Sequence, residues 1–121
     1  MTNPPPRFQS LSDFYPYYLG EHRNGTCRLL HLIGSSSVLM LLAASLLTNN
    51  YWLLLGLAFA GYGPAWVGHY FFERNRPATF DYPGYSFVCD WIMMRDILLG
   101  RVPLLGDLPE ELCVDEGKLA A

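Results

Sequence analysis

The sequence predicts an all-α membrane protein: an antiparallel transmembrane helical hairpin plus an interfacial amphipathic helix. Three observations predict this fold, namely two long apolar runs, a very short turn between them and few charged residues. Of the 121 residues, 51% are hydrophobic and only 16% are charged, whereas soluble domains carry about 25% charged residues. The net charge of −3 and the eight scattered Lys and Arg residues argue against a nucleic-acid partner, which requires a clustered basic surface.

The chain is expected to hold one membrane domain between two polar ends. Residues 1–13 are polar and proline-rich, which indicates a flexible lead, and residues 106–121 form an acidic, solvated tail. The membrane domain over residues 14–105 opens with an aromatic cluster at residues 14–18. Tyrosine is favoured at the headgroup level of a bilayer, so this cluster predicts an interfacial anchor.

Each apolar run is long enough to cross a bilayer as a helix. Residues 29–48 and 51–72 contain no Asp, Glu, Lys or Arg, and about 20 helical residues span the roughly 30 Å hydrocarbon core. The turn at Asn49-Asn50 is so short that the two helices must be antiparallel neighbours. A soluble bundle is disfavoured, because the remaining sequence is too short to cover both helices on all sides.

The basic residues predict the orientation of the hairpin. The turn between the runs carries no charge, and arginines flank the other ends of both runs. Arg7, Arg23 and Arg28 precede the first run, and Arg74 and Arg76 follow the second. Because positively charged flanks stay on the cytoplasmic side, we expect a multi-pass protein with both termini in the cytoplasm.

Small residues recur along both runs at the spacing that close helix packing in lipid requires. They are Gly34, Ser37 and Ala44 on the first helix and Gly56, Ala60, Pro64 and Gly68 on the second. We expect these faces to meet in the hairpin, and a homo-oligomer through similar faces is a further possibility. Beyond the hairpin, residues 85–100 are apolar but carry Asp90, Arg95 and Asp96, which predicts an amphipathic helix at the interface.

The hairpin brings the three histidines of the chain to one end. His31 and His69 lie 17 and 18 residues from the ends of the two runs at the turn, so antiparallel helices hold them at nearly the same depth. His22 precedes the first helix on the same side, and a turn at Asn24-Gly25 lets it face the other two. Ionisable groups in apolar spans are costly, which makes function the default interpretation.

Acidic residues accompany the histidines. Glu73 follows His69 by four residues on the same helix face, and Glu21 adjoins His22. Three imidazoles with carboxylates suit iron, zinc, copper or nickel better than calcium or magnesium. A simpler interpretation remains open, in which the histidines only hydrogen-bond a neighbouring helix or a lipid headgroup. Three arginines are candidates for holding a substrate carboxylate, with lipid phosphate as the alternative partner: Arg28, Arg74 and Arg76.

Two blocks of sequence carry a recognisable pattern. The first is His22-Arg23-Asn24 followed by His31 and Gly34, and the second is the segment 68–74 followed by Arg76-Pro77-Ala78. They resemble the His-x-Asn, His-x-x-Gly and Gly-His-x-x-x-Glu, Pro-Ala segments of the 2-hydroxy fatty acid dioxygenases, formerly a domain of unknown function. The resemblance covers residues 14–80, and the stretch through Gly100-Arg101 is similar to the short bacterial branch.

The chain departs from the family pattern at three positions. Cys27 stands where longer members tend to have Asn, and Trp66 stands near where they have Gln. Tyr82 stands where short relatives often have His, which raises the question whether this position removes a metal ligand.

The resemblance implies an activity and a ligand set. Members are membrane proteins implicated in α-oxidation, an iron(II)-dependent and O2-consuming removal of C1 from a 2-hydroxy fatty acid. For this chain it implies His22, His31 and His69 as iron ligands, with Glu73 as an added ligand or a partner behind them. It also implies a location in the bacterial inner membrane, with the acyl tail of the substrate in lipid or along the hairpin.

The sequence therefore leaves three hypotheses, each for a different class of protein function. The first is the iron(II) dioxygenase that shortens 2-hydroxy fatty acids by one carbon. The second is a non-enzymatic membrane scaffold or lipid-binding protein whose histidines pack or bind metal without turnover. The third is a metal-handling membrane protein. Bound iron together with O2 consumption separates the first from the other two.

Overall fold

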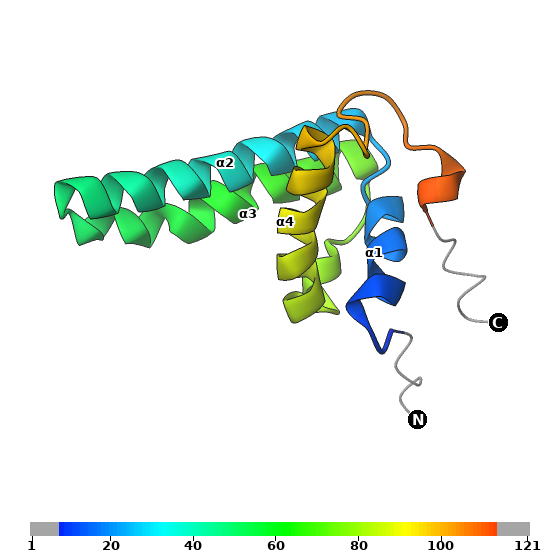
Figure 1. Ribbon diagram of the computed structural model, residues 1–121, viewed down its shortest axis with the longest axis horizontal. Helices are drawn as coiled ribbons and strands as arrows, with labels where there is room; N and C mark the ends of the chain where they lie inside the picture. Colours follow the sequence, from blue (N-terminus) through cyan, green and yellow to red (C-terminus); the bar gives the residue numbers. More distant parts are fainter. Residues whose placement is uncertain (1–7, 114–121) are drawn as a thin grey trace.

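The computed structural model describes residues 8–113, which form helices and no strand. Helices α2 (Gly25–Thr48) and α3 (Leu57–Val67) run antiparallel as a long hairpin. Helices α1 (Leu11–Gly20) and α4 (Pro83–Leu98) stand across one end of this hairpin (Figure 1). We call residues 8–20 and 74–113 the head.

Local sequence signals set the limits of these helices. The Ser10 side chain accepts a hydrogen bond from the backbone N–H of Asp13 at the start of α1, and Asn24 caps the start of α2 in the same way. Such side-chain acceptors satisfy amides that have no partner within the helix. Helix α2 ends at Asn49, whose φ of 56° lies in the left-handed region that asparagine tolerates.

The second apolar run is helical but changes type along its length. It begins as a 3-10 helix (Tyr51–Gly56), continues as α3 and ends as a π-helix (Gly68–Glu73). The all-helical prediction is therefore confirmed, whereas the expected second uninterrupted α-helix is broken into three parts. Within residues 8–113, α2 is the one helix whose length and apolar composition suffice to cross a membrane.

Small residues do allow the close approach of the hairpin helices. A Cβ atom on Gly34 would lie 2.8 Å from the carbonyl oxygen of Gly61, and one on Gly68 would lie 2.9 Å from Sγ of Cys27. Both distances are shorter than real Cβ contacts, so the absence of a side chain sets the helix separation here. Gly56 is different, because its nearest neighbour is the Leu41 side chain at 3.5 Å.

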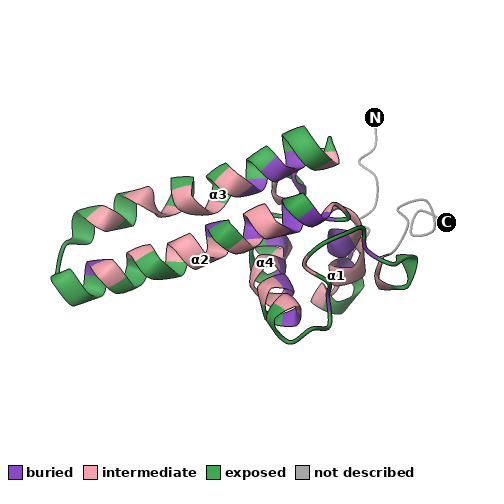
Figure 2. Cartoon of the chain, turned by 90° about the horizontal axis from the view of Figure 1, so that it is seen from above, coloured by how far each residue is buried: buried purple, intermediate pink, exposed green. Residues whose placement is uncertain are grey.

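The hydrophobic core lies in the head, not in the hairpin. Figure 2 shows buried residues where α1, α4 and the base of the hairpin meet, and exposed residues toward the hairpin tip. Phe14 and Tyr18 are 0% and 1% exposed, so these members of the aromatic cluster are core residues and the expected headgroup anchor is wrong for them. Tyr82 packs on Phe8 and Phe14 in the same core.

The predicted helix over residues 85–100 is present as α4, and its charges have partners in the head. Asp96 accepts a hydrogen bond from the Tyr15 hydroxyl at 2.7 Å and pairs with Arg95 and Arg101. Parts of the two predicted polar ends also belong to the fold, since Phe8 and Leu108 are only 4% and 5% exposed. The remainder of those ends, residues 1–7 and 114–121, lies outside the described residues.

Gly34→Ala should destabilise the hairpin, because the added methyl group meets backbone atoms of α3 that cannot rotate away. Overpacking of this kind costs about 1–3 kcal/mol, measurable as a lower midpoint of thermal unfolding in detergent. Gly56→Ala is the matched control, since its methyl group meets a flexible side chain at an ordinary distance. Equal stability of the two variants would contradict the proposed packing.

Candidate metal centre

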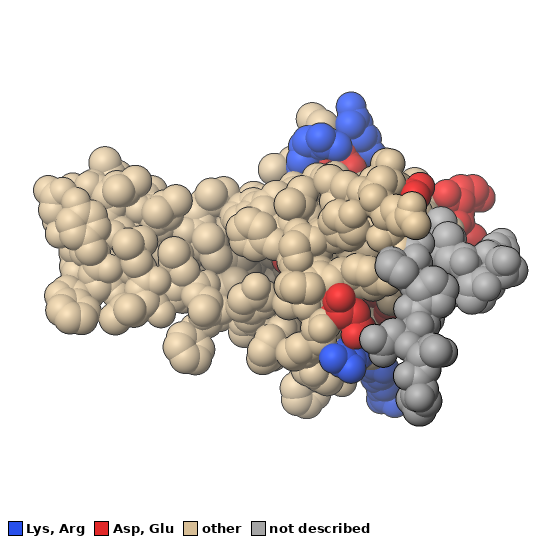
Figure 3. Space-filling model, turned by 90° about the horizontal axis from the view of Figure 1, so that it is seen from below, with Lys and Arg blue, Asp and Glu red and all other residues tan. Residues whose placement is uncertain are grey.

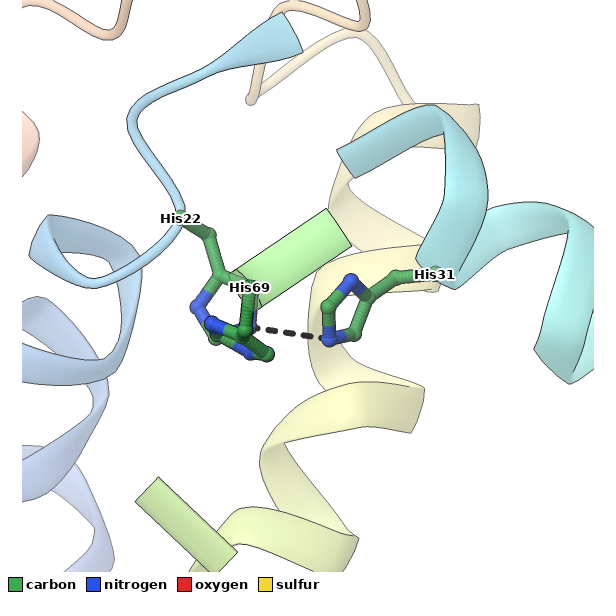
Figure 4. Close-up of side chains that lie close together, drawn as sticks. All are labelled: His22, His31 and His69. Atoms are coloured by element: carbon green, nitrogen blue, oxygen red, sulfur yellow. Dashed lines mark hydrogen bonds between the residues drawn. The ribbon is translucent and has the colours of Figure 1, made fainter. Parts of the chain in front are cut away.

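Three histidines from three segments converge at the base of the hairpin (Figure 4). His22 lies in the loop between α1 and α2, His31 in the second turn of α2, and His69 in the π-helix. Their ring centroids are 4.4, 4.5 and 4.9 Å apart, with planes at 75° to 89° to one another. The rings are buried, and one nitrogen from each lies within 4.8 Å of the others. The predicted convergence is therefore confirmed.

Each imidazole is oriented by a hydrogen-bond acceptor behind it. Nδ1 of His22 donates to the Tyr18 carbonyl at 2.6 Å, and Nδ1 of His31 donates to the Cys27 carbonyl at 2.8 Å. Carbonyl oxygens only accept, so both rings carry their proton on Nδ1. Nδ1 of His69 lies 2.7 Å from Oδ1 of Asn75.

The partners of Asn75 fix the proton on His69 in the same way. The Asn75 amide nitrogen donates to the backbone carbonyl of Glu21 at 3.0 Å and to its carboxylate at 2.7 Å. Its amide oxygen must therefore face His69, which makes Nδ1 of His69 the donor. All three histidines are left with Nε2 as the nitrogen that offers a free lone pair.

This arrangement suits a cation. Nε2 of His22 and Nε2 of His31 are 3.1 Å apart, and neither carries a proton while both Nδ1 atoms do. Burial, followed by the neighbouring His31 and His69, lowers the pKa of His22 well below its usual range, so that ring stays neutral. Two ligand nitrogens that each lie about 2.1 Å from one metal ion, with an angle of about 90° between the two bonds, are about 3 Å apart. The lone pairs thus have a separation typical of two nitrogens on one metal ion.

The loop that carries His22 is fixed by Arg28, which the sequence suggested for substrate binding. The Arg28 side chain is fully buried and donates to the carbonyls of His22 at 2.9 Å, Arg23 at 2.7 Å and Pro103 at 2.8 Å, and to that of Gly106. All three of its side-chain nitrogens thus donate to backbone carbonyls, and Arg28 holds the loop in place instead of facing a substrate.

Glu73 and the other two arginines also lie apart from the histidine group. The Glu73 carboxylate accepts a hydrogen bond from the backbone N–H of Asn24, and the group with ligand spacing consists of the three histidines. Glu73 thus fixes the loop through the Asn24 backbone. Arg74 and Arg76 are exposed, and Arg76 lies over the Phe80 ring and near Asp81.

Two cavities meet beside the histidines. A small one of about 10 Å³ has room for a single ion or water and is bordered by all three rings. A larger one of about 280 Å³ runs along the hairpin, and the two share His31, Tyr62, Ala65 and Asp90. Tyr82 borders neither cavity and packs in the aromatic core, so this position lies apart from the centre.

Asp90 and Tyr18 are site residues that the sequence analysis missed. The Tyr18 ring stacks on His22 with centroids 4.1 Å apart, and its hydroxyl donates to the Asp90 carboxylate. Burial raises the pKa of Asp90 to about 7. The available signal was an acidic residue in an apolar stretch, which we interpreted only as a mark of an interfacial helix.

A family model described as "2-hydroxy-palmitic acid dioxygenase Mpo1-like" matches residues 8–102. This match covers most of the chain, including the three histidines, Asn75 and Asp90. The chain belongs to this family. The same comparisons found no match among curated proteins or among solved structures. The dioxygenase of the family name is thus consistent with the centre described above, in which a buried group of three histidines could hold a metal ion.

His69→Ala should abolish stoichiometric metal binding, because two imidazoles remain where three converge. Glu73→Gln is the matched control, since the amide oxygen of glutamine can still accept from Asn24 and the histidine group is untouched. Metal content after loading with iron(II) under anaerobic conditions, followed by desalting, measures both. Loss of metal in Glu73→Gln with retention in His69→Ala would place the ligands elsewhere.

Asp90 should make the metal-free protein less stable as the pH rises. Its carboxyl titrates near pH 7 when folded, against an ordinary pKa of 3.8, so between these values the unfolded state releases a proton that the folded state keeps. Asp90→Asn should therefore raise the unfolding midpoint at pH 8, and the gain should vanish toward pH 4. Asp81→Asn, at an exposed carboxylate, controls for the loss of one charge. A gain independent of pH would contradict this assignment.

Proposed function

We propose that this protein is a membrane-bound, iron(II)-dependent dioxygenase that removes C1 from 2-hydroxy fatty acids. The observation that carries the proposal is the convergence of three neutral histidine nitrogens in a chain that belongs to the Mpo1-like family. Imidazole is a suitable ligand for iron, and buried rings oriented from behind are typical of metal sites.

His22, His31 and His69 would hold the ion, which would supply a place where a 2-hydroxy acid and O2 bind together and exchange electrons. The residues around them keep that place rigid. The carbonyls of Tyr18 and Cys27 and the amide of Asn75 orient the rings. Arg28 and Glu73 hold the loop of His22 through hydrogen bonds to its backbone.

The proposed reaction balances without a further reductant. One 2-hydroxy acid and one O2 give an acid shorter by one carbon, one CO2 and one water. The C1 carboxyl leaves as CO2, the former C2 becomes the new carboxyl carbon, and O2 accepts all four electrons. Substrate and O2 are thus the only reactants required.

The surface supports insertion of the hairpin into a bilayer. On the face shown in Figure 3, charged side chains gather over the head and none appears toward the hairpin tip. Large apolar side chains are exposed along the tip, among them Leu47 at 83%, Trp52 at 80% and Phe59 at 83%. Both flanks of the hairpin lie at the head end, and the arginines on these flanks support a cytoplasmic orientation of the head.

Turnover should require iron(II), O2 and the histidine group together. Protein purified in detergent without O2 and loaded with iron(II) would receive 2-hydroxy-palmitic acid and then O2, with mass spectrometry of the products. We expect an acid one carbon shorter and an equal amount of CO2 from the wild type and from Glu73→Gln, and neither from His69→Ala. Bound iron without product would exclude this substrate, and product from His69→Ala would exclude this centre.

A further inference from the structure

The larger of the two cavities is a groove with an apolar lining along the hairpin. It has a volume of about 280 Å³, near the lower limit of the range for small-molecule sites. One face of α2, one face of α3 and the side of α4 that carries Phe87 and Trp91 form its walls. We call this cavity the hairpin groove.

The hairpin groove is elongated and begins at the metal centre. On α2 its lining runs from His31 to Val38, and on α3 from Ala65 to Leu57. Seven helical residues correspond to about 10 Å, so the groove leads from the histidines toward the hairpin tip for that distance. At its far end lies the exposed apolar surface of the hairpin.

The polar groups of the groove gather at the histidine end. Asp90 lies there with His31, and both also border the small cavity beside the metal centre. The Asp90 carboxylate accepts from the Tyr18 hydroxyl, and within residues 8–113 no other hydrogen bond or ion pair reaches it. One carboxylate oxygen is thus available to a ligand at the point where groove and centre meet.

We propose that the hairpin groove holds the first part of a single saturated acyl chain whose head group lies between the histidines and Asp90. The identity of the head group, a 2-hydroxy acid, rests on the proposed function. The 2-hydroxyl donates a hydrogen bond to Asp90, and the chain beyond the groove continues along the exposed hairpin surface in lipid. Asp90 is then the residue that distinguishes a 2-hydroxy acid from an unsubstituted one, because only the former has this donor.

Photolabelling of the metal-free protein tests the groove without turnover. The probe is 2-hydroxy-palmitic acid with a diazirine in the first half of its chain, and peptide mapping locates the label. We expect label on the segments 31–38, 57–65 and 87–91, displaced by excess 2-hydroxy-palmitic acid about tenfold better than by palmitic acid, as expected for one hydrogen bond. Label spread over residues 39–55, or equal displacement by the two acids, would overturn the proposal.

Two alanines exposed on the hairpin give a matched pair of variants. Ala58 lines the groove near its far end and Ala43 does not line it. Ala58→Phe should weaken displacement by 2-hydroxy-palmitic acid about tenfold and leave a 2-hydroxy acid of half that length unaffected, whereas Ala43→Phe should change neither. Asp90→Leu should remove the preference for the 2-hydroxy acid. Unchanged displacement in Ala58→Phe overturns the groove, and an unchanged preference in Asp90→Leu overturns the head-group contact.

The outcome separates this proposal from the proposed function. If the groove is labelled but the protein converts no substrate, the acyl-chain site is supported and the proposed dioxygenase function is rejected. If the protein converts the substrate but the groove takes no label, the dioxygenase function is supported and the acyl-chain site is rejected. Helical content by circular dichroism, compared between Ala58→Phe and Ala43→Phe, shows that each variant is folded.

Discussion

The hydrogen bonds of the buried Arg28 guanidinium are the interaction on which the candidate metal centre depends. Two of the three histidines lie in helical segments, whereas His22 lies in a loop that has no regular structure to fix it. Arg28 binds the carbonyls of His22 and Arg23 and joins them to those of Pro103 and Gly106. Removing one partner of a buried charge is costly, so these carbonyls and Arg28 hold one another in place.

The two halves of the molecule bury their residues in different ways. The head has a conventional core of aromatic and aliphatic side chains that includes Phe14, Tyr18 and Met93. The hairpin instead places small residues between its helices and large apolar ones outside, an arrangement suited to a solvent of lipid tails. The histidines lie where these halves join, so packing in the head orients a centre that the hairpin groove approaches along α2 and α3.

The sequence predicted the features that depend on local periodicity. Two apolar runs joined by a short turn, with His31 and His69 at nearly equal distances from it, predicted that these two residues meet. The turn at Asn24 predicted that His22 joins them, and the structure has all three together. The roles of Arg28, Glu73 and Asp90 depend on partners far along the chain. The partners of Arg28, Pro103 and Gly106, follow it by 75 and 78 positions in the sequence. Glu73 and its partner Asn24 are 49 positions apart, and Asp90 and its partner Tyr18 are 72 positions apart. Spacing in a single sequence contains no information on such pairs.

The neutrality of the ligand group favours an acid as the substrate of the proposed dioxygenase. Three imidazoles contribute no negative charge and Glu73 is engaged elsewhere, so an iron(II) ion bound here would keep at least one positive charge in a buried place even with the Asp90 carboxylate nearby. Burial of uncompensated charge is unfavourable, and a carboxylate from outside relieves it. A 2-hydroxy acid brings that carboxylate together with a hydroxyl that can face Asp90. The site would therefore be completed electrostatically by its substrate, which favours binding of acids over the corresponding neutral lipids.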